Sequence, residues 1–142
     1  MNQQSKNQSI IDEITSWIGT PWRHLQCVKG QGVDCVQLII GVAKNLGWLL
    51  PDYNSGKYPR DYSLHNSESL LIEEIKKLCV EIKKEDIGIG DILVFVNGKS
   101  AGHIGFYVGD GLIVHAHIRQ GVVKDAISLF EKGFHSAWRL NV

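Results

Sequence analysis

The sequence predicts an α+β domain in which helices come first and an antiparallel sheet follows. Apolar residues recur at helical spacing before Gly88, whereas the chain after Gly90 shows the alternation and short apolar runs of strands. Helical and strand patterns do not alternate along the chain, which favours an antiparallel over a parallel sheet. The length of 142 residues suits one compact domain, so we assign a single domain to residues 1–142.

The composition limits the classes of function. The chain is 44% hydrophobic and 21% charged, as is typical of soluble globular proteins. Because 15 Lys and Arg balance 15 Asp and Glu, a general nucleic-acid binder is not expected. Residues 1–8 are polar and predict no signal peptide, and no stretch predicts a membrane span. We therefore expect synthesis in the cytoplasm and a separate delivery route to any target outside it.

Two helices are expected in the first third of the chain. Ser9 is a candidate N-cap for the first helix, which would run to about Ile18 and end at Gly19-Thr20-Pro21. Asp34 is a candidate N-cap for the second, whose residues 36–46 are apolar on nearly all sides. A helix of this kind is normally buried at the centre of a domain.

A third helix is expected from a cap at Ser67 through Leu78, with Glu and Lys on its solvated face. Residues 51–66, which precede it, are polar and aromatic and predict a long surface loop. Such a loop either lines a binding site or only connects two elements, and both alternatives stay open.

Five strands are expected after Gly90, at residues 91–96, 103–108, 112–118, 122–124 and 135–140. A three-residue loop at 109–111 would pair residue 108 with 112 and 106 with 114, and would gather the apolar side chains on one face. The other face would then carry His117 opposite His103. It would also carry His115 opposite Gly105, where the missing side chain leaves room beside the imidazoles.

Cys35 follows the candidate cap Asp34 and would lie in the first turn of the second helix. The positive end of the helix dipole and the free backbone N–H groups there favour a thiolate, so we expect a pKa below the usual value of about 8.5. A histidine on a rigid strand, here His103, is the usual base for such a thiol. The two residues together predict a hydrolase with a cysteine nucleophile.

The chain has two other cysteines, and the odd total predicts free thiols rather than a disulfide framework. Cys79 stands beside the apolar Leu78 at the end of the third helix and is expected in the core. Cys27 is expected to be a loop thiol, one that could oxidise against Cys35 if the loop folds back. No metal or other cofactor is expected, because His24, His117 and Cys27 lack the paired spacing of metal ligands.

Five stretches of the chain form a set of motifs in a fixed order. They are Gly19-Thr20-Pro21-Trp22-Arg23, Asp34-Cys35-Val36-Gln37-Leu38, Gly90-Asp91-Ile92-Leu93-Val94-Phe95, Gly102-His103-Ile104-Gly105-Phe106-Tyr107 and Val114-His115-Ala116. In this order they resemble the NlpC-type cell-wall cysteine peptidases, which are small papain-like enzymes that cut peptidoglycan stem peptides. The insertion at residues 24–32 resembles the phage-associated branch of that family.

The resemblance implies a papain-like fold with the nucleophile helix packed on a C-terminal antiparallel sheet. It implies that Cys35 is the nucleophile, His103 the general base and acid, and His115 the residue that orients His103. The implied reaction is amide hydrolysis through an acyl-enzyme, typically at a D-γ-glutamyl–diamino acid bond, with an oxyanion hole of backbone N–H groups near Cys35. Four residues are assigned to substrate binding, namely Trp22, Arg23, Asp34 and His117.

The chain departs from the family pattern at two places. Trp22 stands where the family usually has Tyr, and Val36-Gln37 stands where Ser-Gly is common. Three classes of function therefore remain: a peptidoglycan hydrolase, a papain-like acyltransferase or lipid-acting thiol enzyme, and a weakly active structural or binding module of a phage tail. The expected partners are a peptidoglycan peptide and, for the third class, phage tail proteins.

Overall fold

The computed structural model describes residues 2–58, 68–97, 100–130 and 133–140, with the backbone alone for 68–71, 97 and 100–103. The helices are α1 (Gln3–Thr15), α2 (Cys35–Asn45) and α3 (Glu68–Leu78), with short 3-10 turns η1 (Lys84–Asp86) and η2 (Ile127–Leu129). The strands are β1 (Cys27–Val28), β2 (Gly32–Val33), β3 (Cys79–Ile82), β4 (Ile92–Asn97), β5 (Ser100–Gly109), β6 (Leu112–His117), β7 (Gly121–Ala126) and β8 (Phe134–Leu140).

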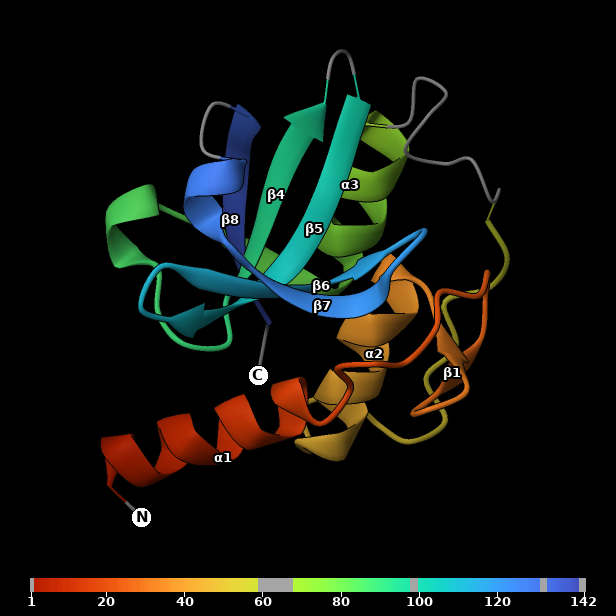
Figure 1. Cartoon of the computed structure of the whole chain (residues 1–142), viewed down its shortest axis with the longest axis horizontal. Coiled ribbons are helices and arrows are strands. Elements are labelled where there is room, and N and C mark those ends of the chain that lie inside the picture. Colours follow the sequence, from red (N-terminus) through yellow and green to blue (C-terminus); the bar gives the residue numbers. More distant parts are fainter. Residues whose placement is uncertain (1, 59–67, 98–99, 131–132, 141–142) are drawn as a thin grey trace.

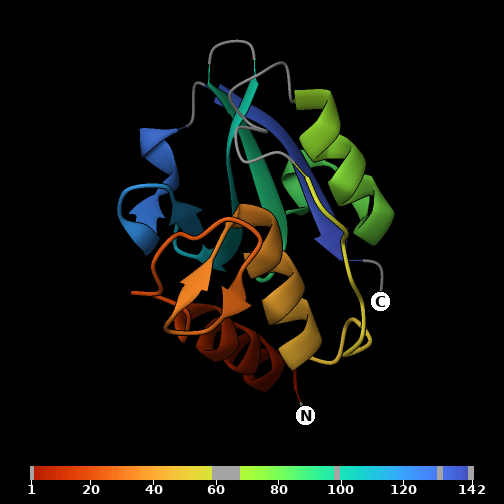
Figure 2. The same cartoon turned by 90° about the vertical axis from the view of Figure 1, so that its right-hand side faces the viewer.

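Six of these strands form one antiparallel sheet in the order β3-β8-β4-β5-β6-β7, and β1 pairs with β2 in a separate ribbon. The helices α2 and α3 pack on the same face of the sheet, with α1 across the end of α2 (Figures 1 and 2). The main core lies between these helices and the sheet. This arrangement confirms the predicted α+β fold with α2 packed on the sheet. No helix in the described ranges is both long and apolar enough to cross a membrane.

The first helix starts earlier than the sequence predicts. Asn2 is its N-cap and accepts a hydrogen bond from the backbone N–H of Ser5 at 2.8 Å. Ser9, the expected cap, lies inside the helix and donates its hydroxyl back to the carbonyl of Ser5 at 3.1 Å. The helix also ends at Thr15 rather than near Ile18. The early turns were missed because their polar residues carry no apolar periodicity, although Gln and Lys are good helix formers.

The central helix α2 starts where the sequence predicts. Asp34 caps it, and seven residues of the helix are buried. Gly41 lies in its interior, where a Cβ atom would stand 2.7 Å from the Trp17 ring and 2.9 Å from the sulfur of Cys27. The glycine therefore lets Trp17, which follows α1, and the strand β1 approach the helix closely. This packing outweighs the low helix propensity of glycine.

The turn between β5 and β6 has two residues rather than three. Asp110 and Gly111 have φ of +55° and +72°, as a two-residue hairpin turn requires, and Gly109 pairs with Leu112. Val108 is the extra residue of a bulge, so the expected pair of Val108 with Leu112 is wrong. Because the bulge restores the register, the expected pairs of residue 106 with 114 and 105 with 115 are confirmed.

Strand β3 was not predicted, because it continues directly from α3 without a turn signal and pairs with β8 at the edge of the sheet. The strands β1 and β2, of two residues each, were also missed. Cys79 begins β3 and is buried, which confirms its expected place in the core. In the long predicted loop, residues 51–58 have no regular structure. The proposed cap Ser67 and residues 59–66 of that loop lie outside the described residues.

Candidate active site

The start of α2 is built around the carboxylate of Asp34, which is 1% exposed. Its Oδ1 accepts the backbone N–H of Gln37 and its Oδ2 that of Leu25, each at 2.8 Å. The hydroxyl of Tyr58 lies 2.7 and 2.6 Å from the two oxygens and donates to them. One buried charge thus joins the first helical turn, the loop before it and the segment 51–58, and three donors offset the cost of its burial.

Cys35 follows Asp34 and is partly buried in the first turn of α2. Burial, and then the charge of Asp34, raise the pKa of its thiol to about 12. The backbone N–H groups of Val36 and of Cys35 itself act in the opposite direction but do not compensate. The expected pKa below about 8.5 is therefore wrong for this structure. Desolvation outweighs the helix terminus, and the thiol is protonated at neutral pH.

Three aromatic rings lie beside this helix start. The ring of His24 meets Tyr58 edge-on at 5.5 Å and stacks on Trp22 at 6.4 Å, measured between ring centroids. The Nδ1 of His24 also lies 3.8 Å from Oδ2 of Asp34. An open hollow of about 620 Å³ runs along residues 22–26. The sequence analysis considered His24 only as a metal ligand and Tyr58 only as part of the aromatic loop 51–66, so it placed neither residue at the start of this helix.

The residues assigned to substrate binding in this region also have contacts within the chain. Trp22 forms an isolated β-bridge with Val33 through the backbone, and the Nε of Arg23 donates to the carbonyl of Gln31 at 3.0 Å. Both therefore help to shape the loop before α2. Asp34 acts as the helix cap described above. Their part in substrate binding stays a prediction.

His115 lies on β6 and is buried, with 1% of the residue exposed. Its Nε2 is 2.7 Å from Oδ2 of Asp125 on β7, and its ring meets Phe130 edge-on at 5.5 Å. Asp125 pairs with Ile113, so it lies diagonally across the two strands from His115 on the same face. Asp125 was missed because it follows the predicted strand 122–124, whose register with β6 no local signal defines.

His117 has a structural contact of its own. Its Nδ1 accepts the backbone N–H groups of Arg119 and Gln120 at 3.1 and 3.2 Å, and so closes the turn between β6 and β7. Pairing between β5 and β6 runs from Gly109–Leu112 to Gly105–His115, so His117 is not paired with His103 as expected. His117 is instead the partner of Gly121 on β7.

His103 lies on β5, as predicted, and its backbone is paired with Phe95 on β4. Its side chain lies outside the described part of the structure. The structure therefore places Cys35, and separately His115 with Asp125, whereas the triad that joins them stays a prediction.

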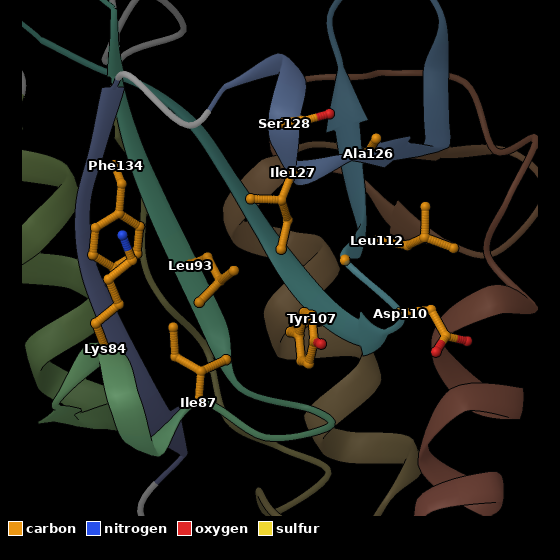
Figure 3. Close-up of a pocket in the computed structure, with 11 residues that line it drawn as sticks. Lys84, Ile87, Leu93, Tyr107, Asp110, Leu112, Ala126, Ile127, Ser128 and Phe134 are labelled. Carbon is orange, nitrogen blue, oxygen red and sulfur yellow. The ribbon is translucent and has the colours of Figure 1, made fainter.

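The other candidate groups lie elsewhere. The sulfur of Cys27 donates to the carbonyl of Gln37 at 3.3 Å, which directs it toward the body of α2. In the described ranges no group of three His, Cys, Asp or Glu could hold a metal ion. A second hollow, of about 620 Å³, has Lys84 and Phe134 at one end and Asp110 at the other (Figure 3). None of the predicted site residues line it.

These observations define an α+β domain with a cysteine on the first turn of its central helix. A model of the NlpC/P60 family matches residues 19–139, and the chain belongs to that family. It is 21% identical over 133 residues to "Murein DD-endopeptidase MepS/Murein LD-carboxypeptidase" of Escherichia coli K12. That match covers 92% of this chain and 61% of the relative, so the chain spans under two thirds of the relative's length.

Solved structures show the same fold. The NlpC/p60 domain of the peptidoglycan hydrolase SagA has a TM-score of 0.64 at 17% identity, over 96% of this chain and 98% of that one. A protein of the NLP/P60 family from Staphylococcus aureus has a TM-score of 0.67 at 19% identity, and the match covers 100% of this chain and 43% of that one. RipD of Mycobacterium tuberculosis, described as a non-catalytic domain adapted to peptidoglycan binding, has 0.58 at 14%, over 96% of each chain.

Proposed function

We propose that this protein is a cysteine peptidase that hydrolyses an amide bond of peptidoglycan stem peptides, of the D-γ-glutamyl–diamino acid type. The observation that carries the proposal is Cys35 on the first turn of α2, within a family match that covers most of the chain. An open hollow runs along residues 22–26, and the backbone N–H of Leu25 in that stretch donates to the cap Asp34, which directly precedes Cys35. The E. coli relative, named a murein endopeptidase, supports the substrate class.

The raised pKa of Cys35 determines how the thiol would attack. Because the thiol is protonated at neutral pH, a base must take its proton as the sulfur–carbon bond forms, and we assign that step to His103. His103 would then donate the proton to the leaving amine as the amide bond breaks, leaving an acyl-enzyme. Water, deprotonated by His103, would attack the thioester, release the acid and return the proton to Cys35.

His115 is assigned the part of orienting His103. Asp125 holds the Nε2 of His115 at 2.7 Å, and we assign the other ring nitrogen, Nδ1, to the contact with His103. The backbone N–H groups of Val36 and Cys35 act as donors toward the sulfur, and we assign them to the oxyanion.

Digestion of purified muropeptides tests this proposal. We expect product masses that fit hydrolysis at the D-γ-glutamyl bond, and no product from Cys35→Ala. The variant should keep its melting temperature within a few degrees, because the thiol is small and only partly buried. Intact muropeptides after incubation with the folded wild-type protein would refute the proposal.

A second candidate function is peptidoglycan binding without cleavage. It is favoured by the high pKa of the Cys35 thiol, and the non-catalytic RipD shows that the fold is compatible with that role. Retention of intact muropeptides by both wild type and Cys35→Ala would select it. Acyl transfer by the same thiol would instead show as an added amine acceptor made heavier by the acyl group of the muropeptide.

The place of action is also a proposal. The insertion at residues 24–32 supports a phage-associated protein that is made in the cytoplasm and carried to the cell wall by a phage particle, with tail proteins as partners. Detection of the chain in purified virions by mass spectrometry would test this, and its absence from them would refute it.

A further inference from the structure

Tyr58 brings the segment 51–58 to the start of α2 by more than one contact. Its hydroxyl lies 2.7 and 2.6 Å from the two oxygens of Asp34, and 3.4 Å from the Nε2 of Gln37. That same Nε2 donates to the hydroxyl of Ser55 at 3.0 Å. A loop far along the chain is therefore tied to the first turn of the helix on which Cys35 lies.

From this geometry we infer that Tyr58 is a positioning residue for the Cys35 thiol and acts through the carboxylate of Asp34. The inference rests on the proposed function, in which Cys35 is the nucleophile. It identifies a tyrosine outside the predicted triad as a determinant of the reaction rate.

Tyr58 can act on Cys35 because the charge of Asp34 lies next to the thiol in the chain. Asp34 directly precedes Cys35, and its negative charge opposes formation of the thiolate. A hydroxyl that donates to this carboxylate stabilises its charge and weakens its field at the sulfur. The same hydrogen bond holds the carboxylate in its capping position, which keeps the first turn and the sulfur in place.

Other titratable groups also face this carboxylate. His24, from the loop before α2, has its Nδ1 at 3.8 Å from Oδ2, and its ring meets Tyr58 edge-on. Cys27, from β1, is a second thiol, and burial raises its pKa; the charge of Lys44 lowers this pKa and that of Asp34 raises it. The side chain of His103 lies outside the described residues. An experiment must therefore report on Cys35 separately from Cys27.

Tyr58→Phe removes the hydroxyl and keeps the ring. The matched control is Tyr53→Phe, in the same segment, whose ring packs against the main core and whose phenol faces Glu74 and Lys77 of α3. Each protein is treated with iodoacetamide at pH 8.5, digested with trypsin and analysed by mass. Cleavage at Lys and Arg places the three cysteines in separate peptides, at residues 24–29, 30–44 and 78–83.

We expect Tyr58→Phe to slow alkylation of Cys35 by about three- to tenfold. At a pH well below the pKa of a thiol, each unit by which that pKa rises lowers the thiolate fraction tenfold. The kcat for muropeptides should fall by a similar factor with KM unchanged. Tyr53→Phe should match the wild type in both measurements. Alkylation of the buried Cys79 should stay slow in every variant, as a check that the fold is intact.

A second comparison uses Asp34→Asn. If Tyr58 acts through the charge of Asp34, Tyr58→Phe should have no further effect on alkylation in that background. Equal alkylation of wild type and Tyr58→Phe would overturn the inference, as would a rise in KM with kcat unchanged, which indicates substrate contact. If wild type cuts no muropeptide but Tyr58→Phe still slows alkylation, the proposed function fails and the positioning role stands.

Discussion

The start of α2 and the β6–β7 hairpin each bury one polar side chain, yet they hold it in different ways. Asp34 and His115 are both 1% exposed. Asp34 accepts two backbone N–H groups from residues nearby in the chain, as well as the hydroxyl of Tyr58. His115 is held by the side chain of Asp125 on the next strand. The helix cap in the first arrangement follows from local sequence and stabilises the fold, whereas the second arrangement depends on strand register and orients a ring.

The largest effect on stability is expected from Asp34→Ala. This change removes the cap of α2 and leaves three donors without their acceptor. The free energy of unfolding should therefore fall by about 3–5 kcal/mol. Chemical denaturation of wild type and variant measures this difference. Ser9→Ala is the control, because Ser9 lies inside α1 and its loss should change stability by less than about 0.5 kcal/mol. A large loss in Ser9→Ala would mean that α1 starts at Ser9 after all.

The same contrast explains what the sequence could predict. The cap at Asp34 was predictable because the donor, the N–H of Gln37, lies three residues away on the same helix. Tyr58 and Asp125 were not, because each reaches its partner only after distant segments have folded together. The strand of His103 was predictable from alternation, and the register at Gly105 and His115 survived a wrong turn length because the bulge at Val108 compensates for it. The pKa of Cys35 was not predictable, since burial depends on packing from several elements.

Asp125→Asn should reduce activity far more than stability, in contrast to Asp34→Ala. The amide keeps the shape of the carboxylate but not its charge, so it supports the ring of His115 less well in orienting His103. We expect kcat for muropeptides to fall by about 10- to 100-fold, with a melting temperature within a few degrees of wild type. Asp110→Asn, at an exposed turn position that asparagine tolerates, is the matched control. An unchanged kcat in Asp125→Asn would show that His115 does not depend on this carboxylate.

Stability should also fall at alkaline pH because of Cys35. Its pKa is raised to about 12 in the folded protein, so the unfolded thiol ionises first as the pH rises. Stability from the protonated thiol is therefore fully present below the unfolded pKa of about 8.5 and is lost progressively above it, by about 1–2 kcal/mol at pH 10. Denaturation at pH 7 and pH 10 measures the loss. It should be smaller by that amount in Cys35→Ala; an equal loss in both proteins would exclude Cys35 as its source.

The smallest effect is expected from His117→Ala, and it tests which histidine belongs to the site. His117 accepts two backbone N–H groups in the exposed turn after β6, and water can replace it there. We therefore expect kcat to fall less than about threefold and stability by about 0.5–1 kcal/mol. His115→Ala should be strongly impaired, but because the ring is buried its loss also leaves a cavity, so kcat must be compared at equal folded fraction. If His117→Ala then proves more damaging to kcat than His115→Ala, His115 does not orient His103, and the proposed triad must be assigned anew around His117.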